Sequence, residues 1–201
     1  MICTGNQCRS PMADVLFRDG LARRGVDGRV SSAGLISEGV PASGGSVRAM
    51  AKRGLDLEGH RSTPLEADAV VTADLIVGMT REHVREAVVL VPEAFERAFT
   101  LRELVRRAED VGPPADLGPV VVPGGPTTGM GAPGLEPLSA WLSRLSAGRR
   151  ATDLIGDDPA DDVTDPMGRS RRFYERTAAE IEDLVTRFLD VALPTPVAAT
   201  P

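Results

Sequence analysis

Residues 3–11 read Cys-Thr-Gly-Asn-Gln-Cys-Arg-Ser-Pro, at the very start of a chain of 201 residues. Cys3 and Arg9 are separated by five residues, of which Gly5 and Asn6 tolerate left-handed backbone. Such a segment can curl so that its N–H groups point inward around a tetrahedral anion. The stretch therefore predicts a phosphate-binding loop with a thiol at its base.

A helix is predicted to begin at Pro11, with Ser10 as its N-cap. Its free N–H groups and the positive end of its dipole then face the loop, which stabilises an oxyanion and favours the thiolate form of Cys3. The planar guanidinium of Arg9 can hold two oxygens of a phosphoryl group as that group passes to sulfur. The Ser10 hydroxyl is placed to donate to the same sulfur. The pattern indicates a cysteine nucleophile that attacks phosphorus.

This stretch resembles the signature C-x-G-N-x-C-R-S-P of the low-molecular-weight protein tyrosine phosphatase family, and it matches that signature through Pro11. Further segments fall in the family's order, so the resemblance covers most of residues 2–190. They are Ser32-Ala33-Gly34, Gly59-His60-Arg61-Ser62, residues 73–79 and Phe99-Thr100-Leu101. The family also implies a late aspartate, followed by proline on a mobile loop, that protonates the leaving group. Asp165-Pro166 stands where that motif belongs.

The resemblance implies a set of site residues. The catalytic residues are Cys3, Arg9 and Asp165, and His60 resembles a family histidine that hydrogen-bonds the loop asparagine, so that Asn6, Ser10 and His60 support the loop. An ordinary surface histidine is the other interpretation of His60. The phosphate-binding residues are Thr4, Gly5, Asn6, Gln7, Cys8, Arg9 and Ser10.

Cys8 has two possible roles. It can capture oxidised Cys3 in a reversible disulfide, a pattern that the family also suggests, or it is a small buried core residue.

The expected function is hydrolysis of phosphotyrosine-type protein phosphomonoesters through a phosphocysteine intermediate, with a phosphorylated protein or peptide as the partner. A protein arginine phosphatase with the same mechanism is an alternative, because Gln7 stands where tyrosine phosphatases carry an aliphatic residue and arginine phosphatases a threonine. In addition, Met167-Gly168 replaces a tyrosine pair. An arsenate reductase-like protein would need a further downstream cysteine pair, which the sequence lacks. An inactive phosphate-binding relic is the remaining alternative.

Composition limits the class of protein. The length suits one domain, and 42% apolar residues can fill its core. The sequence has no apolar run that could span a bilayer and no signal peptide, so we expect a cytoplasmic protein without a membrane partner. A net charge of -6 argues against a nucleic-acid partner, and the two cysteines have no accompanying His/Cys cluster, so no metal or cofactor is assigned. The oligomeric state is left open.

Alternating helix and strand patterns predict an α/β three-layer fold, with a four-stranded parallel sheet flanked by helices and the phosphate-binding loop after the first strand. After the loop, predicted strands cover residues 29–33, 73–79 and 97–100. Predicted helices start at Pro11 and cover residues 47–53, 82–90 and 138–148, and an apolar stripe of Phe173, Thr177, Ile181, Leu184, Val185 and Phe188 marks a long terminal helix.

The predicted domain covers residues 1–192, with a Gly/Pro-rich insertion at 111–134 and a disordered tail at 193–201. The acidic residues 157–162 are expected to form a solvated loop rather than a metal site. Arg169, Arg171 and Arg172 oppose the dipole of the terminal helix, which indicates either an acidic substrate or a solvated face.

The first strand is predicted to be largely missing. Only Met1 and Ile2 precede Cys3, and at about 3.3 Å per residue they cover less than half of a usual strand. We therefore expect Met1 not to be the natural start and further apolar strand residues to precede it.

Overall fold

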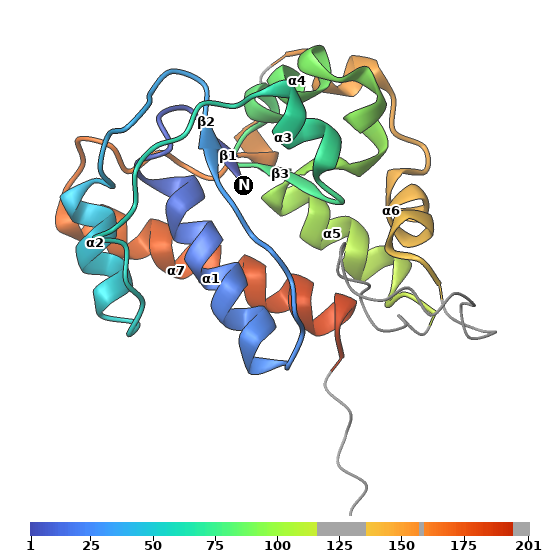
Figure 1. Ribbon diagram of the computed structural model, residues 1–201. Coiled ribbons are helices and arrows are strands. Elements are labelled where there is room, and N and C mark those ends of the chain that lie inside the picture. Colours follow the sequence, from blue (N-terminus) through green and yellow to red (C-terminus); the bar gives the residue numbers. More distant parts are fainter. Residues whose placement is uncertain (116–135, 157–158, 195–201) are drawn as a thin grey trace, which may run out of the picture.

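The computed structural model describes residues 1–115, 136–156 and 159–194. A four-stranded parallel sheet with the strand order β2-β1-β3-β4 lies between two sets of helices (Figure 1). This is the predicted three-layer α/β fold. The strands are β1 (Ile2–Cys3), β2 (Ala33–Gly34), β3 (Ile76–Gly78) and β4 (Ala98–Thr100).

Helices cover both faces of the sheet. In Figure 1, α1, α2 and α7 lie together on one side of the strands, whereas α3 and α4 lie on the other. The α-helices are α1 (Arg9–Arg23), α2 (Gly44–Ala51), α3 (Ala67–Thr72), α4 (Arg81–Leu90), α5 (Leu101–Val111), α6 (Leu138–Ser146) and α7 (Arg171–Ala192). Three short 3-10 turns complete the described elements: η1 (Pro92–Arg97), η2 (Ala151–Leu154) and η3 (Pro159–Asp161).

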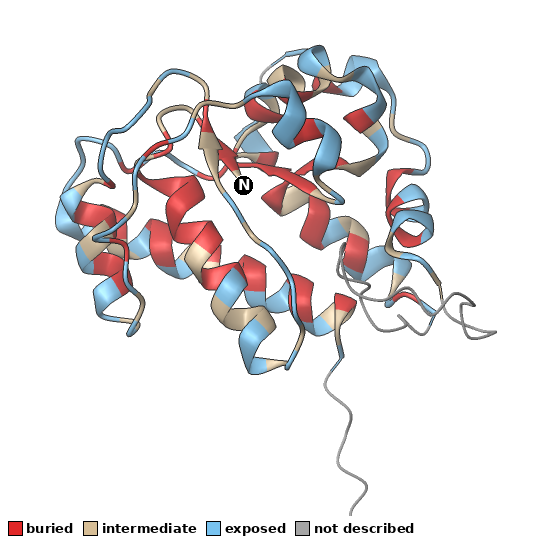
Figure 2. Ribbon diagram, viewed as in Figure 1, coloured by how far each residue is buried: buried red, intermediate tan, exposed pale blue. Residues whose placement is uncertain are grey.

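The alternation of strand side chains divides the core into two clusters. Ile76 and Ala98 belong to the cluster that includes α3 and α4, whereas their neighbours Val77 and Phe99 belong to the one that includes α1, α5 and α7. The buried faces of the helices accordingly turn toward the sheet (Figure 2). The helices therefore exclude water from both faces of the sheet. A functional site is confined to the edge where the strands end.

The first strand is short, as predicted, but it occupies the centre of the sheet. Ile2 lies opposite both Ala33 and Gly78. Hydrogen bonds extend beyond the two strand residues, since the Met1 carbonyl accepts from Ala33 over 2.9 Å and the Thr4 carbonyl accepts from Leu35 over 2.8 Å. The neighbouring strands thus have backbone partners from Met1 to Thr4, so the ladders are not left unpaired.

Several boundaries differ from the sequence prediction. Helix α1 begins at Arg9 and its N-cap is Cys8, not Ser10, because the Ser10 hydroxyl is engaged inside the loop. Each later strand starts after its predicted first residue, and residues 29–32 are not a strand. Helices α3 and α5 were not predicted. The start of α5 carries a local signal, since Thr100 caps it by accepting from the Glu103 amide.

The predicted insertion at 111–134 lies mostly outside the described residues, and so does most of the predicted tail. Helix α5 includes Val111, so the helical part of the domain extends into the first residue of that window. Ala115 and Glu136 flank residues 116–135, and the Glu136 amide donates to the Ala115 carbonyl over 2.9 Å. The two ends of this segment therefore meet beside α5.

Gly34 provides a test of how closely the sheet approaches the loop. A Cβ on Gly34 would lie 2.8 Å from the Asn6 amide nitrogen and 3.0 Å from the Gly5 carbonyl carbon. Since backbone cannot shift as cheaply as a side chain, Gly34→Ala should lower the free energy of unfolding by about 1–3 kcal/mol. Urea denaturation measures this. Gly59→Ala is the matched control because a Cβ there meets no atom within 4 Å. Equal losses of unfolding free energy in the two variants would contradict the close approach of Gly34 to the loop backbone.

Candidate active site

The loop between β1 and α1 presents its backbone amides without protein partners. The amides of Gly5, Asn6, Gln7 and Cys8 donate to no acceptor among the described residues. Asn6 has a φ of 47°, so it takes the left-handed conformation expected of it, whereas Gly5 does not. Because α1 starts at Arg9, its positive end adds to the field of these amides. Free amides at the start of a helix are an arrangement that can hold an anion.

Asn6 is held on three sides. Its side chain is fully buried, with Nδ2 donating to Ser10 Oγ over 2.8 Å and Oδ1 accepting from the Thr63 amide over 2.9 Å. Its carbonyl oxygen lies 2.7 Å from Nε2 of His60. The histidine thus contacts the loop asparagine as the resemblance implied. These contacts stabilise a backbone conformation that a non-glycine residue adopts at a cost.

The buried thiol of Cys3 has one oriented donor. Ser10 Oγ donates to Cys3 Sγ over 3.0 Å, and both residues are buried. Asn6 Nδ2 donates to the same Ser10 oxygen, so that the Ser10 hydroxyl hydrogen remains free to point at sulfur. The expected contact between Ser10 and Cys3 is present, and it stabilises negative charge on the sulfur.

Arg9 joins the loop to the segment that carries Asp165. Its side chain is 5% exposed, and Nη2 forms an ion pair of 2.8 Å with Asp165 Oδ2. Nη1 donates to the Val163 carbonyl over 3.1 Å. Nε is buried and has no hydrogen-bond partner among the described residues. That orphaned donor is notable because unpaired buried N–H groups are rare and one beside free loop amides suits an oxyanion.

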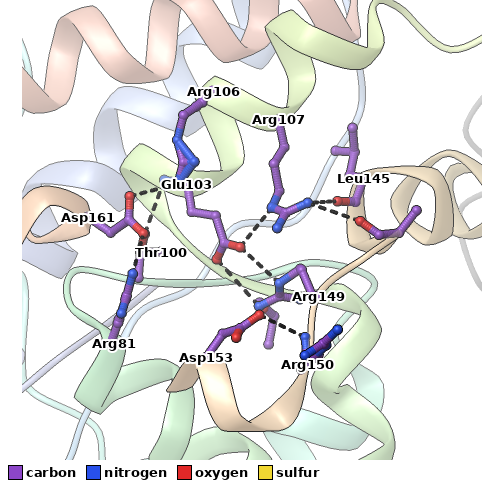
Figure 3. A network of polar contacts seen from close by, with 12 residues as sticks. Arg81, Thr100, Glu103, Arg106, Arg107, Leu145, Arg149, Arg150, Asp153 and Asp161 are labelled. Carbon is purple, nitrogen blue, oxygen red and sulfur yellow. Dashed lines mark hydrogen bonds and ion pairs between the residues drawn. The ribbon is translucent and has the colours of Figure 1, made fainter. Parts of the chain in front are cut away.

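The segment before Asp165 is fastened to the sheet and to two helices. The Val163 amide donates to the Met79 carbonyl over 2.8 Å, and Val163 is fully buried. Asp161 accepts from Arg81 over 3.1 Å and from Arg106 over 2.9 Å (Figure 3). The side chain of Asp165 remains 45% exposed. Its position at the loop is therefore set by buried contacts of the preceding residues.

The prediction of a solvated loop for the acidic residues 157–162 is wrong for Asp161. Asp161 is buried, because arginines from α4 and α5 neutralise it, so it does not belong to a solvated loop. Asp162 accepts from the Arg81 amide over 3.1 Å. Residues 157–158 lie outside the described residues.

His83 also lies at the site, although no sequence motif pointed to it. It is buried, its Nε2 lies 3.0 Å from Thr4 Oγ1 in the loop, and its Nδ1 lies 2.8 Å from Thr80 Oγ1 at the start of α4. Burial, reinforced by the positive charge of Arg9, lowers the pKa of His83 to about 3. A neutral imidazole therefore joins the loop to α4. A lone histidine in an amphipathic helix gave no signal for this role.

Cys8 differs from Cys3 in its surroundings. Its thiol donates to Ser43 Oγ over 3.3 Å and lies 3.7 Å from the Tyr174 hydroxyl. Burial raises the pKa of Cys8 above the ordinary value. Cys8 is therefore a protonated thiol packed between α2 and α7.

Gln7 lies at the rim of the loop. Its Nε2 donates to Ser37 Oγ over 3.4 Å. Ile36 precedes that serine and is 74% exposed, and Met167, two residues after Asp165, is 46% exposed. The Ile36 amide donates to the Thr4 carbonyl over 3.2 Å, and Met167 follows the aspartate that pairs with Arg9. Apolar side chains from two segments that are distant in sequence thus lie near the loop.

The described residues lack two features, a metal-binding cluster and a membrane-spanning helix. No group of three or more His, Cys, Asp or Glu side chains is arranged to hold a metal ion in the described part of the chain. Within the same residues, no helix has the length and apolar character needed to cross a membrane.

The sequence of this chain is similar to those of known proteins. The family model of low molecular weight phosphotyrosine protein phosphatase matches residues 1–118. A protein-arginine-phosphatase of Bacillus subtilis is 36% identical over 105 residues, which are 52% of this chain and 69% of that protein. A probable low molecular weight protein-tyrosine-phosphatase, EpsP of Ralstonia solanacearum, is 38% identical over 104 residues, covering 52% of this chain and 70% of that protein.

A solved structure extends the likeness beyond the matched segment. The low molecular weight protein tyrosine phosphatase from T. tengcongensis superposes with a TM-score of 0.64 and 28% identity, over 94% of this chain and 95% of that one. The likeness in fold therefore includes the C-terminal part that carries Asp165.

The pKa of His83 predicts how stability depends on pH. Its pKa falls from 6.5 to about 3 on folding, so between these values the unfolded chain binds a proton on this residue that the folded chain does not. Acidification below 6.5 should therefore lower the free energy of unfolding, by up to about 1.4 kcal/mol per pH unit from this residue. In urea denaturation between pH 7 and pH 5, His83→Gln should show a shallower decline than the unmodified protein. Parallel curves would contradict the prediction.

Proposed function

The chain belongs to the low molecular weight phosphotyrosine protein phosphatase family, and from this membership we propose that it hydrolyses phosphotyrosine in protein substrates through a phosphocysteine formed on Cys3. One arrangement carries the proposal. The thiol of Cys3 accepts from Ser10 at the base of a loop whose amides are free, and Arg9 stands beside it with an unpartnered Nε. The catalytic roles of Arg9 and Asp165 are part of the same proposal.

Binding would use donors that already point at the loop. Oxygens of the phosphoryl group would accept from the amides of residues 5–8 and from the guanidinium of Arg9. Asp165 Oδ2 now accepts from Arg9 Nη2, so the phosphate would share or replace this contact. The carboxyl group of Asp165 would then lie beside the oxygen that leaves.

The reaction would consist of two displacements at phosphorus. In the first, the Cys3 thiolate forms a sulfur–phosphorus bond, the phosphorus–oxygen bond to tyrosine breaks, and Asp165 gives its proton to the phenolic oxygen. In the second, water attacks phosphorus while the Asp165 carboxylate takes a proton from it, and the sulfur leaves as a thiolate. The Ser10 hydroxyl stabilises that thiolate.

Exposed apolar surface supports an aromatic leaving group. Ile36 and Met167 are both exposed near the loop, and their apolar side chains suit a phenyl ring better than a guanidinium. Phosphotyrosine is accordingly the substrate that we propose.

Replacement of the nucleophile tests the covalent mechanism. Cys3→Ser should abolish measurable turnover of a phosphotyrosine peptide, because the serine hydroxyl is not ionised at neutral pH, while phosphate or vanadate should still bind. Turnover is followed by release of inorganic phosphate, and binding by titration calorimetry. A phosphoarginine peptide of the same sequence should be the poorer substrate of the unmodified protein. Turnover by Cys3→Ser near the original rate would exclude Cys3 as the nucleophile.

Asp165→Asn tests the proposed acid. Loss of the proton donor should lower kcat on a phosphotyrosine peptide by about 10²- to 10⁴-fold, and far less on an aryl phosphate whose leaving group has a low pKa. Asp162→Asn is the matched control, since its amide oxygen can still accept from the Arg81 amide. Stopped assays with the two substrates measure both effects. If Asp162→Asn proves the more damaging variant, the acid has been assigned to the wrong residue.

A further inference from the structure

A cluster of unpaired positive charge lies at the start of α7. Arg169, Arg171, Arg172 and Arg176 are all exposed, and none forms an ion pair with a described residue. The first turn of α7 contains no acidic residue. Because this end of a helix is already positive, arginines there are unfavourable by themselves.

The charged side chains farther along α7, unlike those at its start, are paired with opposite charges. Arg187, near its C-terminal end, pairs with Glu109 over 2.8 Å and with Asp183 over 3.2 Å. Glu175 and Glu180 are neutralised by Lys52 and Arg102 over 2.7 and 2.6 Å. The unpaired cluster is thus a local feature of a chain with 29 acidic and 23 basic residues, and not a consequence of general basicity.

The cluster borders the candidate active site. The Arg169 amide donates to the Pro166 carbonyl over 2.9 Å, so only one turn separates it from Asp165. Tyr174 lies in the first part of α7, and its hydroxyl is 3.7 Å from Cys8 Sγ in the phosphate loop. The first turn of α7 therefore stands at the rim of the loop.

Helix geometry separates the arginines from one another. Arg171 precedes Tyr174 by three residues and shares its face, which is turned toward the loop. Arg172 precedes it by two and lies on the opposite face. Arg169 and Arg176 are packed on the Phe173 ring, 5.7 and 4.6 Å from its centroid. Arg171 is the cation best placed for a molecule bound at the loop.

We propose that Arg171, assisted by Arg169, binds acidic side chains that flank the phosphorylated residue of a protein substrate. This docking surface rests on the proposed function, and it adds a preference for acidic sequence around phosphotyrosine. An acidic segment would supply the negative charge that this turn lacks. Because such a contact forms with the whole substrate before and during chemistry, it should lower KM and leave kcat unchanged.

The test compares two phosphotyrosine peptides of equal length, one with Asp and Glu beside the phosphorylated residue and one with Asn and Gln in their places. The unmodified protein should show a kcat/KM about 5- to 10-fold higher on the acidic peptide, and added salt should reduce this ratio. Arg171→Glu should abolish the preference through KM alone. Arg172→Glu carries the same charge change on the opposite face and should retain most of it.

Further measurements separate this proposal from the proposed function. Melting temperatures show whether each variant folds, and Arg171→Gln serves if Arg171→Glu does not. All variants should hydrolyse p-nitrophenyl phosphate, which has no flanking residues, at the unmodified rate. Hydrolysis of that ester without a preference for the acidic peptide would overturn the docking surface alone, as would an equal loss in Arg171→Glu and Arg172→Glu. No hydrolysis of either substrate would overturn the proposed function.

Discussion

The left-handed backbone of Asn6 is the constraint on which the site depends. A φ of 47° turns the chain in the middle of a loop whose amides donate to no acceptor among the described residues. This turn persists because three groups from separate segments hold the residue. Ser10 comes from α1, and His60 and Thr63 come from the chain that passes beside β2. The loop is therefore stabilised by tertiary contacts, which explains why so short a first strand can support it.

Ion pairs of buried side chains hold Asp165 at that loop. Arg9 reaches across to Val163 and Asp165, while Asp161 is fixed by Arg81 and Arg106. Arg9 and Asp161 are buried, and a buried charge that loses its partner is strongly destabilising. Positions of the segment that break these pairs are therefore disfavoured. Val163, two residues before Asp165, is fully buried in the apolar cluster that includes α1, α5 and α7.

The fold and the contact of Ser10 with Cys3 could be predicted from the sequence because both depend on local patterns. Alternating strands and helices predict the parallel sheet, and residues 3–11 predict a loop in which the serine reaches the cysteine. That this loop binds an anion stays a prediction. His83 and Asp161 were not predicted in their observed roles. Each owes its role to partners far along the chain, such as Thr4 for His83 and Arg106 for Asp161, and no spacing within one segment reports such contacts.

A long Gly/Pro-rich stretch precedes Asp165 in the sequence, and anchors on either side of this stretch explain how the chain tolerates it. The family model ends at residue 118, well before the aspartate. After residue 135 the chain rejoins the core in α6, where Trp141, Leu142 and Leu145 are buried. Arg149 follows; its side chain is 2% exposed and pairs with Glu103 (Figure 3), and it lies 4.3 Å from the centroid of the Phe99 ring. Since closing a longer loop costs little additional entropy, the length of the stretch matters less than the anchors on either side of it. Arg149 holds the returning chain against β4 and α5. The contacts of Asp161 and Val163 then hold Asp165 next to Arg9, and they do not depend on the length of the Gly/Pro-rich stretch.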